Sequence, residues 1–386
     1  MGLCIQPVRS ERELTSFVDL PFGLYAPDSP WVPPLKSQDR RLLTPGKHPF
    51  WETARRELFL ALRDGAPVGR IAAIVDEKSN AYTQENCGAF GFFECADDRE
   101  AAHALLAAAR QWLADQGMAF MRGPLNPSTN YTCGLLVDGF ALAPTIMMPW
   151  NPPYYAELLE SWHLRKEQDL FAYLIERNHM ATPSWLSTEV ARLKAESRFT
   201  CRTSSKATLK EDIRAMLEIY RVSWAKNWAF APLSEGEANE HVKELSGILD
   251  PEFFVLFFHK DEPAAGMVAL PDMNPLLKRL NGGLGPLAPW HWWRSRAAIR
   301  SGYRIILFGI KEEYRLLGLP LLLLDYMLET ARRKPEFQWV EGSWVLEDNV
   351  AIDELIEDFS GRITKRYRIY RREIAAEAPD TDGAAV

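Results

Sequence analysis

An internal duplication constrains the fold of this chain more than any other feature. Three pairs of segments keep one offset of 197 to 198 residues: WVPPL with WAFAPL, PVGRIAAIVD with AAGMVALPD, and NPPYYAELL with NVAIDELI. Chance rarely keeps one offset at three places, so we predict two copies of one fold. The segments between these anchors keep a different offset, which indicates an extra loop in a different place in each copy.

The copies divide the chain of 386 residues into two predicted domains, residues 1–178 and 179–375. The boundary falls in the polar segment RNHMATP, which ends in proline. Residues 376–386 are small and acidic, and we expect a disordered tail there.

Charge and cysteine usage exclude several classes of function. The net charge of −7 gives no reason to expect a nucleic-acid partner. The five cysteines are scattered without a C-x-x-C pair and the seven histidines lack metal-ligand spacing, so we predict no metal site and a reducing compartment. The N-terminus turns charged early, and no uncharged apolar run approaches the ~18 residues of a membrane span, so the predicted location is cytoplasmic.

The apolar periodicity of the second copy alternates between strand and helix. It predicts a hairpin over 253–270, strands at 304–310, 338–346 and 365–373, and helices at 209–222, 318–333 and 349–359. The first copy follows the same order, with helices at 98–116 and 153–161.

This order of elements resembles the GNAT acyltransferase superfamily. The resemblance implies an α/β (α+β) fold of tandem GNAT-like domains, each a mixed, mainly antiparallel sheet flanked by helices. In that fold a central strand diverges from its neighbour, and acyl-CoA lies in the V-shaped gap. The expected co-substrate is therefore acyl-CoA.

The likeness is most specific between strand 304–310 and helix 318–333. The superfamily's cofactor loop, Arg/Gln-x-x-Gly-x-Gly/Ala, resembles the segment RLLGLP. Backbone N–H groups at a helix start attract a pyrophosphate, and glycine lets it approach closely. Proline in the last position removes one donor amide. With the asparagine that opens the next helix, the predicted cofactor residues are Arg315, Leu316, Leu317, Gly318, Leu319, Pro320, Leu321 and Asn349.

The first copy has no such loop. Its equivalent segment, ECADD, is acidic and repels a pyrophosphate, so we predict that only the second copy binds acyl-CoA. Across nearly the whole chain, RGPLNPSTNYTCGLLVDGF, MMPWNPPYYAELLE, KNWAFAPL and EGSWVLEDN are similar to a family of two-copy bacterial proteins that includes bacterial ceramide synthases. This resemblance implies transfer of an acyl chain from a thioester to a sphingoid or other long-chain amine.

Acyl transfer to an amine needs a base and an acid for the departing thiolate, but no nucleophilic side chain. Glu341 lies on a strand that lines the expected cleft, and Asp272 ends the strand that carries the thioester-oxygen donor in the superfamily. Either is a candidate base. The alternative role is an exposed strand-end charge for Glu341 and a turn or helix cap for Asp272. Tyr367 is a candidate acid, and Tyr370, three positions on, faces the other side of the strand. Core packing is the alternative role for both tyrosines.

Polar groups among aromatics mark the expected acceptor site. Trp224, Asn227 and Trp228 follow the first helix of the second copy, where the superfamily binds acceptors; the alternative is an aromatic packing cluster. We also assign Asn274 and Asn130 to this site, although Asn130 could be a plain turn residue.

The segment GPLAPWHWWRSRAAIRSGYR lies in the extra loop of the second copy. Trp290, Trp292 and Trp293 stand beside Arg294, Arg296 and Arg300, a composition typical of peripheral contact with the inner membrane. A tryptophan plug that closes the cleft is the alternative. We therefore expect an N-acyltransferase of GNAT type. The rivals are an acetyltransferase of a small polar amine and a non-catalytic protein that binds acyl-CoA or lipid.

Overall fold

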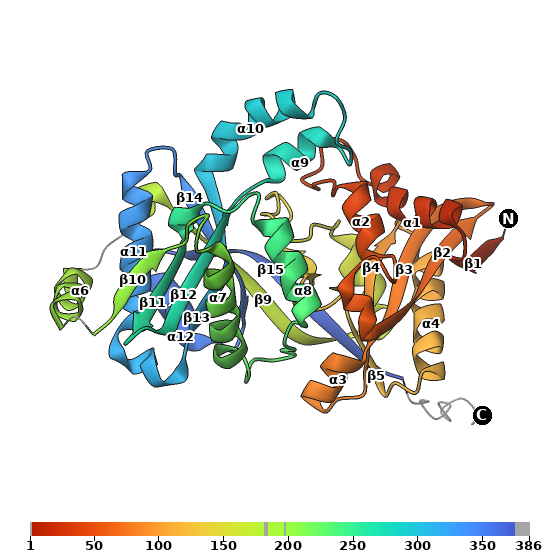
Figure 1. The fold of residues 1–386 in the computed structure, drawn as a ribbon. Helices are drawn as coiled ribbons and strands as arrows, with labels where there is room; N and C mark the ends of the chain where they lie inside the picture. The colour runs from red at the N-terminus through yellow and green to blue at the C-terminus, as the bar shows by residue number, and fades with distance from the viewer. Residues whose placement is uncertain (1, 181–183, 197, 375–386) are drawn as a thin grey trace, which may run out of the picture.

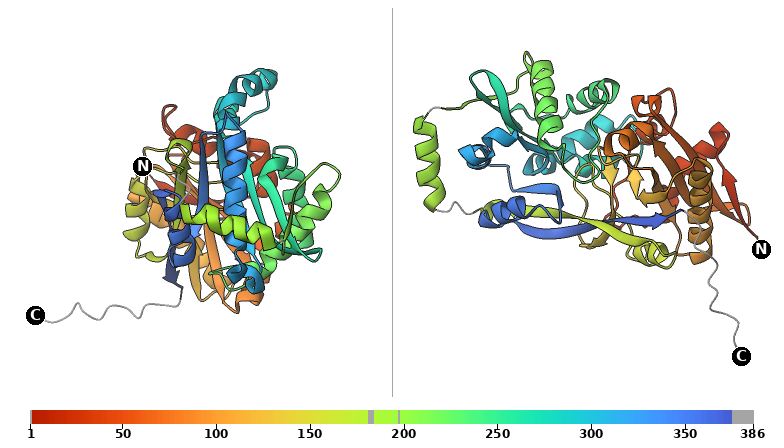
Figure 2. Two further views of the ribbon diagram at one scale, coloured as in Figure 1. Left: turned by 90° about the vertical axis from the view of Figure 1, so that its left-hand side faces the viewer. Right: turned by 90° about the horizontal axis from the view of Figure 1, so that it is seen from below.

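The computed structural model describes residues 2–180, 184–196 and 198–374, so the predicted tail at 376–386 lies outside the described residues. Within them, thirteen strands join one large mixed sheet, and a two-stranded ribbon lies beside it (Figures 1 and 2). Helices cover both faces of this sheet. The mixed α/β architecture of two similar halves is confirmed.

The first half contains β1 (Leu3–Pro7), α1 (Glu11–Leu24), α2 (Lys36–Leu42), β2 (Ala54–Arg63), β3 (Ala66–Asp76), α3 (Glu77–Thr83), β4 (Cys87–Cys95), α4 (Arg99–Asp115), β5 (Phe120–Gly123), β6 (Leu125–Asn126), β7 (Thr132–Cys133), β8 (Leu135–Asp138), α5 (Tyr154–Glu160) and β9 (Arg165–Glu176).

The second half contains α6 (Ser184–Glu196), β10 (Thr200–Thr203), α7 (Leu209–Ser223), α8 (Glu235–Leu245), β11 (Phe254–His259), β12 (Glu262–Pro271), α9 (Asn274–Leu280), α10 (Ala288–Ser301), β13 (Gly302–Ile310), α11 (Leu319–Arg333), β14 (Trp339–Leu346), α12 (Val350–Asp358) and β15 (Arg362–Glu373). All the helices and strands predicted for this half are present. The tryptophan segment, expected as a loop, forms helix α10.

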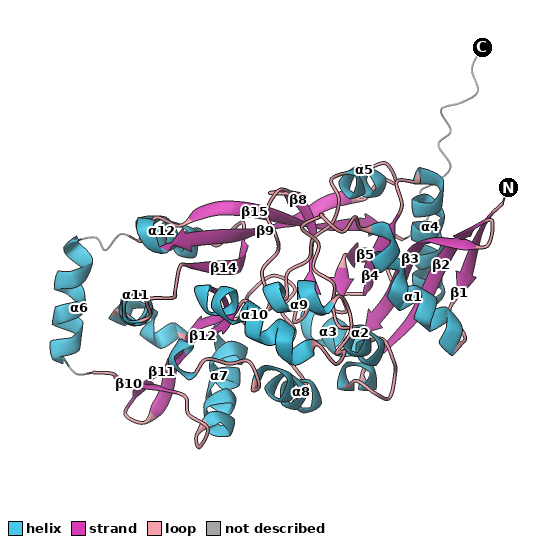
Figure 3. Ribbon diagram, turned by 90° about the horizontal axis from the view of Figure 1, so that it is seen from above, coloured by secondary structure: helices cyan, strands magenta, loops and turns pink. Residues whose placement is uncertain are grey.

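The two halves exchange their last strands, which the sequence did not predict. The strand order in the middle of the sheet is β5-β15-β9-β14. The final strand β15 pairs with β5 of the first half, and β9 of the first half pairs with β14 of the second. Figure 3 shows β9 and β15 running side by side across both halves. Backbone hydrogen bonds therefore join the halves into one continuous sheet.

Alternation along each strand supplies apolar side chains to both faces. In β11, Val255 and Phe257 pack with the α11 side of the sheet, while Phe254 and Leu256 pack with the α7 side. This explains why strands such as FFVLFF read as continuous apolar runs. Tyr367 and Tyr370 likewise enter different core clusters, so the prediction that they face opposite sides of β15 is confirmed.

Candidate active site

A V-shaped gap opens between two parallel strands of the second half. Strands β13 and β14 pair from Gly302–Trp339 to Ile305–Gly342, and no further. Strand β13 continues alone on this side to Ile310, while β14 stays paired with β9 on its other edge. The backbone of β13 beyond Ile305 therefore lacks a strand partner on the side that faces the gap.

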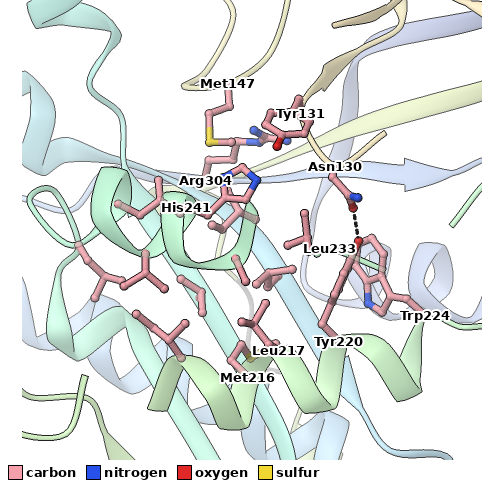
Figure 4. Close-up of a pocket in the computed structure, with 18 of the residues that line it drawn as sticks. Asn130, Tyr131, Met147, Met216, Leu217, Tyr220, Trp224, Leu233, His241 and Arg304 are labelled. Carbon is pink, nitrogen blue, oxygen red and sulfur yellow. Dashed lines mark hydrogen bonds between the residues drawn. The ribbon is translucent and has the colours of Figure 1, made fainter. Parts of the chain in front are cut away.

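A largely apolar cavity of about 160 Å³ lies at the mouth of this gap. Its walls come from both halves: α7, α8, β12, β13 and the start of the divergent part of β14, and the loop around Asn130 of the first half. Figure 4 shows aliphatic side chains of α7, including Met216 and Leu217, at one end, and Arg304, His241 and Tyr131 at the other. The cavity therefore has a polar end and an apolar end, an arrangement that suits an amphiphilic molecule.

His241 at the polar end was missed by the sequence analysis, which considered histidines only for metal spacing. Burial lowers the pKa of His241 to about 4, so the imidazole is neutral near pH 7. Its Nε2 atom is buried and has no hydrogen-bond partner among the described residues. Its helical spacing with Ala238, Val242 and Leu245 could have indicated a residue facing inward.

A buried polar cluster lies behind Arg304, at the vertex of the gap. The Arg304 guanidinium donates to the Ser343 hydroxyl at 2.8 Å, to the Ser343 carbonyl at 3.1 Å and to the Ile146 carbonyl at 2.8 Å. The sequence analysis did not single out Arg304. It lines the cavity while its charge is held in place by both halves of the chain.

Asp272 has one oxygen that is fixed and one that is free. Its Oδ1 accepts hydrogen bonds from the backbone N–H of Ile146 at 2.9 Å and of Asn274 at 3.2 Å. No hydrogen bond to Oδ2 is found within the described residues. Burial raises the pKa of Asp272 to about 6, and Glu341 adds to this, although the two backbone N–H groups oppose it. A carboxylate with these properties can take up a proton near neutral pH.

Glu341 is instead enclosed by donors. Its side chain is 1% exposed, and its oxygens accept from Thr145 at 2.5 Å, Ser343 at 2.8 Å and Lys365 at 2.5 Å. Lys365 is itself buried and comes from the exchanged strand β15. Because Ser343 links Glu341 to Arg304, this ion pair holds the cavity's guanidinium in position.

The Tyr367 hydroxyl is buried and has no hydrogen-bond partner among the described residues. Burial and the nearby Glu341 raise the pKa of Tyr367 well above its usual value. The phenol therefore stays protonated and able to donate. The Tyr370 hydroxyl donates to Glu160 at 2.9 Å, outside the site.

The structure brings some of the predicted acceptor residues to the cavity and not others. Trp224 lines it, and so does Asn130, whose Oδ1 accepts from the Tyr220 hydroxyl at 2.5 Å (Figure 4). Asn274 lies outside the lining; its side chain donates to the Pro144 carbonyl at 2.7 Å. Asn227 and Trp228 do not line the cavity either, and Trp228 packs under the Arg122 guanidinium.

The predicted cofactor loop has the expected form. Gly318 has a φ of +83°, and α11 begins at Leu319 with Pro320 in its first turn. Pro320 has no N–H group, so it removes one donor from the start of this helix. The N–H groups of Leu321 and Leu322 donate to the Gly318 carbonyl at 3.1 and 3.2 Å. Arg315 donates to the carbonyls of Ser223 and Ile310, and Leu316 is 97% exposed. Asn349 precedes α12, without a side-chain cap bond.

Helix α6, absent from the sequence predictions, covers the outer side of this loop. A hollow of about 350 Å³ lies between them, lined by Arg315 and Leu316 on the loop side. On the α6 side its charged lining residues are of both signs: Arg192, Arg198, Glu189 and Glu196. Leu193 reaches the loop backbone: a Cβ on Gly318 would lie 2.5 Å from its Cδ1.

The tight fit at Gly318 predicts a measurable effect of adding one methyl group. In Gly318→Ala, a side chain at positive φ and a contact with Leu193 should cost about 1–3 kcal/mol of unfolding free energy. Chemical denaturation, followed by circular dichroism, gives the change in unfolding free energy. Gly247→Ala is the control, because nothing lies within 4 Å of that position. Equal stability of the two variants would contradict the prediction.

The corresponding gap in the first half is filled by the chain itself. Strands β4 and β5 pair only from Cys87 to Ala89. Beyond this, Asn126 accepts a hydrogen bond from the backbone N–H of Phe92 at 2.5 Å, and a Cβ on Gly91 would lie 1.7 Å from the Leu125 carbonyl oxygen. The start of helix α4 already holds an anion, since the Asp98 carboxylate accepts from the N–H of Ala101.

Within the described residues, no group of three or more His, Cys, Asp or Glu side chains is arranged to hold a metal ion. No helix in this part of the chain is long and apolar enough to cross a membrane.

Known proteins resemble the whole chain. It is 32% identical to the "Bacterial ceramide synthase" of Caulobacter vibrioides, over 96% of this chain and 98% of that one. It is 29% identical to "Protein YghO" of Escherichia coli, over 95% and 94%. No protein-family model matches.

Two solved structures share the fold at low sequence identity. A "Tandem GNAT protein from the clavulanic acid biosynthesis pathway" has a TM-score of 0.57 at 12% identity, covering 98% of this chain and all of that one. A "GCN5-related N-Acetyltransferase from Sphaerobacter thermophilus" has a TM-score of 0.53 at 12% identity, covering 97% of each. The predicted tandem GNAT fold is confirmed.

Proposed function

We propose, on the premise that this chain belongs to the GNAT-superfamily acyltransferase family of the bacterial ceramide synthase, that it is an acyl-CoA-dependent N-acyltransferase of long-chain, sphingoid-type amines. The supporting observation is the amphiphilic cavity, whose polar end is lined by Arg304 and whose apolar end can receive an aliphatic chain. Asp272 lies behind this lining and is linked to Arg304 through the backbone of Ile146.

In the proposed reaction, the amine nitrogen attacks the thioester carbonyl carbon. Asp272 accepts the proton from nitrogen, directly or through one water, through its free Oδ2 atom. The C–N bond forms, the C–S bond breaks, and the departing thiolate takes a proton from Tyr367. The fixed positive charge of Arg304 disfavours a protonated amine at the polar end, which keeps the nucleophile neutral.

The acyl donor is assigned to the gap between β13 and β14. Its thioester oxygen would accept from the unpaired backbone of β13, and not from β12 as expected from the sequence, because β12 is paired along both of its edges. Its pyrophosphate would lie at Gly318 and the start of α11. Arg315, Leu316, Leu317, Leu319, Pro320, Leu321 and Asn349 complete the proposed donor site. Glu341 acts in this scheme as a positioning residue for Arg304.

We assign to residues 1–178 the role of a degenerate copy that shapes the acceptor side and to residues 179–375 the role of the acyl-CoA-binding domain. The filled gap of the first half and the Asp98 carboxylate at its helix start support this division. The loop from Pro144 to Ile146 carries the contribution of the first half to the polar cluster.

Substrate consumption distinguishes this proposal from its rivals. The purified protein should release CoA from palmitoyl-CoA in the presence of a 2-amino-1,3-diol with a long chain, and mass spectrometry should detect the amide. Preferential use of acetyl-CoA with a small polar amine would favour the acetyltransferase. Acyl-CoA binding without acylation of any amine would favour the non-catalytic alternative.

The apolar end of the cavity predicts chain-length selectivity. Leu217→Trp adds bulk to its wall, so kcat/KM for the longest amines should fall about 10–100-fold while short-chain amines react as before. Val222→Trp, on the same helix but exposed, is the control. A series of amines of increasing chain length gives the measurement. An equal loss for all lengths would contradict the placement of the chain.

A further inference from the structure

The segment between β12 and β13 forms an arm whose composition differs from that of the whole protein. Residues 273–301, here called the α9–α10 arm, contain five basic residues and no acidic residue, although the chain has a net charge of −7. Figure 1 and the left view of Figure 2 show α10 projecting from the body of the molecule.

The arm exposes large apolar side chains. Leu284 and Leu287 in its connecting loop are more than 60% exposed, and three tryptophans of α10 are about half exposed: Trp290, Trp292 and Trp293. Helix α10 packs on the protein through Ser295 and Ile299, and Trp290 and Trp293 lie on the opposite side and stack on each other. None of the three tryptophans lines the cavity, so the structure offers no support for a plug.

Exposed arginines surround these rings. Arg294 lies over the Trp290 ring and Arg296 over the Trp293 ring. Arg279, Arg294, Arg296 and Arg300 are exposed and form no ion pair within the described residues. Half-exposed indole rings flanked by unpaired arginines are complementary to the surface of an anionic bilayer. The indole rings can insert into the headgroup layer, and the guanidinium groups can bind lipid phosphates.

The arm is also connected directly to the candidate active site. It begins immediately after Asp272 and ends three residues before Arg304. Its base is fixed to the first half, because Lys278 donates to the carbonyls of Ser29 and Trp31 at 2.6 and 2.7 Å. Any surface that the arm contacts therefore lies at a fixed position relative to the polar cluster.

We propose that the α9–α10 arm docks on an anionic phospholipid surface, from which the acceptor amine is drawn into the cavity. The docking surface is made by Leu284, Leu287, Trp290 and Trp293, with Arg294 and Arg296 at its rim. The delivery step depends on the function proposed above, whereas docking itself does not.

Co-sedimentation with vesicles tests the docking. The protein should bind phosphatidylglycerol–phosphatidylcholine vesicles, with a blue-shifted tryptophan emission, and should bind pure phosphatidylcholine much more weakly. Arg294→Gln/Arg296→Gln should lower binding to anionic vesicles about fivefold for each arginine removed. Trp290→Ala/Trp293→Ala should lower it at least tenfold. Trp185→Ala, which removes a half-exposed tryptophan of α6, should leave binding unchanged.

Three results would overturn the proposed docking. If the protein binds neutral and anionic vesicles equally well, or if Trp185→Ala loses as much vesicle binding as Trp290→Ala/Trp293→Ala, the arm is not the docking surface. A dimer that forms without lipid and dissociates in Trp290→Ala/Trp293→Ala would assign the face to a second copy. With a soluble short-chain amine, which needs no membrane, the arm variants should keep full activity. If the unmodified protein acylates no amine at all, the proposed function is contradicted, but the conclusion from vesicle binding is unaffected.

Discussion

Asp272→Asn should lower kcat about 10²–10⁴-fold, because the amide keeps the hydrogen bonds to Ile146 and Asn274 but cannot accept a proton from the amine. The substitution is isosteric and should leave the unfolding midpoint and the affinity for acyl-CoA nearly unchanged. Release of CoA, measured with a thiol reagent under saturating substrate, gives the rate.

The pH profile provides a second measure of the same role. Burial raises the pKa of Asp272 to about 6. The carboxylate is therefore mostly ionised and active above pH 6, and mostly protonated and inactive below pH 6. The rate of the unmodified protein should follow this curve, and the residual rate of Asp272→Asn should not. Asp261→Asn, an exposed carboxylate in the turn between β11 and β12, is the control.

A different outcome would reassign the base. If Asp272→Asn remains active while Glu341→Gln loses activity without unfolding, Glu341 takes that role and its ion pair with Lys365 must open during turnover. If both single variants and the double variant form product, neither carboxylate is the base. The acyltransferase fold would be unaffected by either result.

Lys365→Met should destabilise the protein by about 3–5 kcal/mol, because it leaves the Glu341 carboxylate buried without its countercharge. The Thr145 and Ser343 hydroxyl groups remain as donors but supply no charge. Chemical denaturation, followed by fluorescence and circular dichroism, gives the change in unfolding free energy.

The double variant Lys365→Met/Glu341→Leu should recover much of this loss, since it removes both buried charges together. Its stability should return while its activity stays low, because Ser343 and Arg304 lose the partner that orders them. Lys226→Met is the control, because the Lys226–Glu312 pair is largely exposed and should contribute no measurable stability. A Lys365→Met variant as stable as the control would show that the buried pair does not support the site.

The success of the sequence analysis depended on features encoded locally. Apolar periodicity located β11 to β15, and the glycine of RLLGLP marked the start of helix α11, because backbone hydrogen bonds and glycine conformation act over a few residues. The opposite orientations of Tyr367 and Tyr370 followed from strand alternation alone.

The site required contacts that no local pattern encodes. Glu341 and Asp272 had similar claims as the base in the sequence, and their environments differ because Lys365, Thr145 and Ile146 arrive from distant segments. His241 and Arg304 face the cavity only because α8 and β13 are packed against the first half.

The sequence by itself therefore determined the duplication, the strands β11 to β15 with the helices α7, α11 and α12 of the second copy, and the glycine before α11, since each is set by repeats or short-range periodicity. Only the tertiary structure decided that β9 and β15 are exchanged, that the first gap is filled by Asn126, and that Asp272 keeps one oxygen free. The physical reason is that strand pairing and burial depend on which distant segments meet, and the two copies offer each strand two nearly equivalent partners.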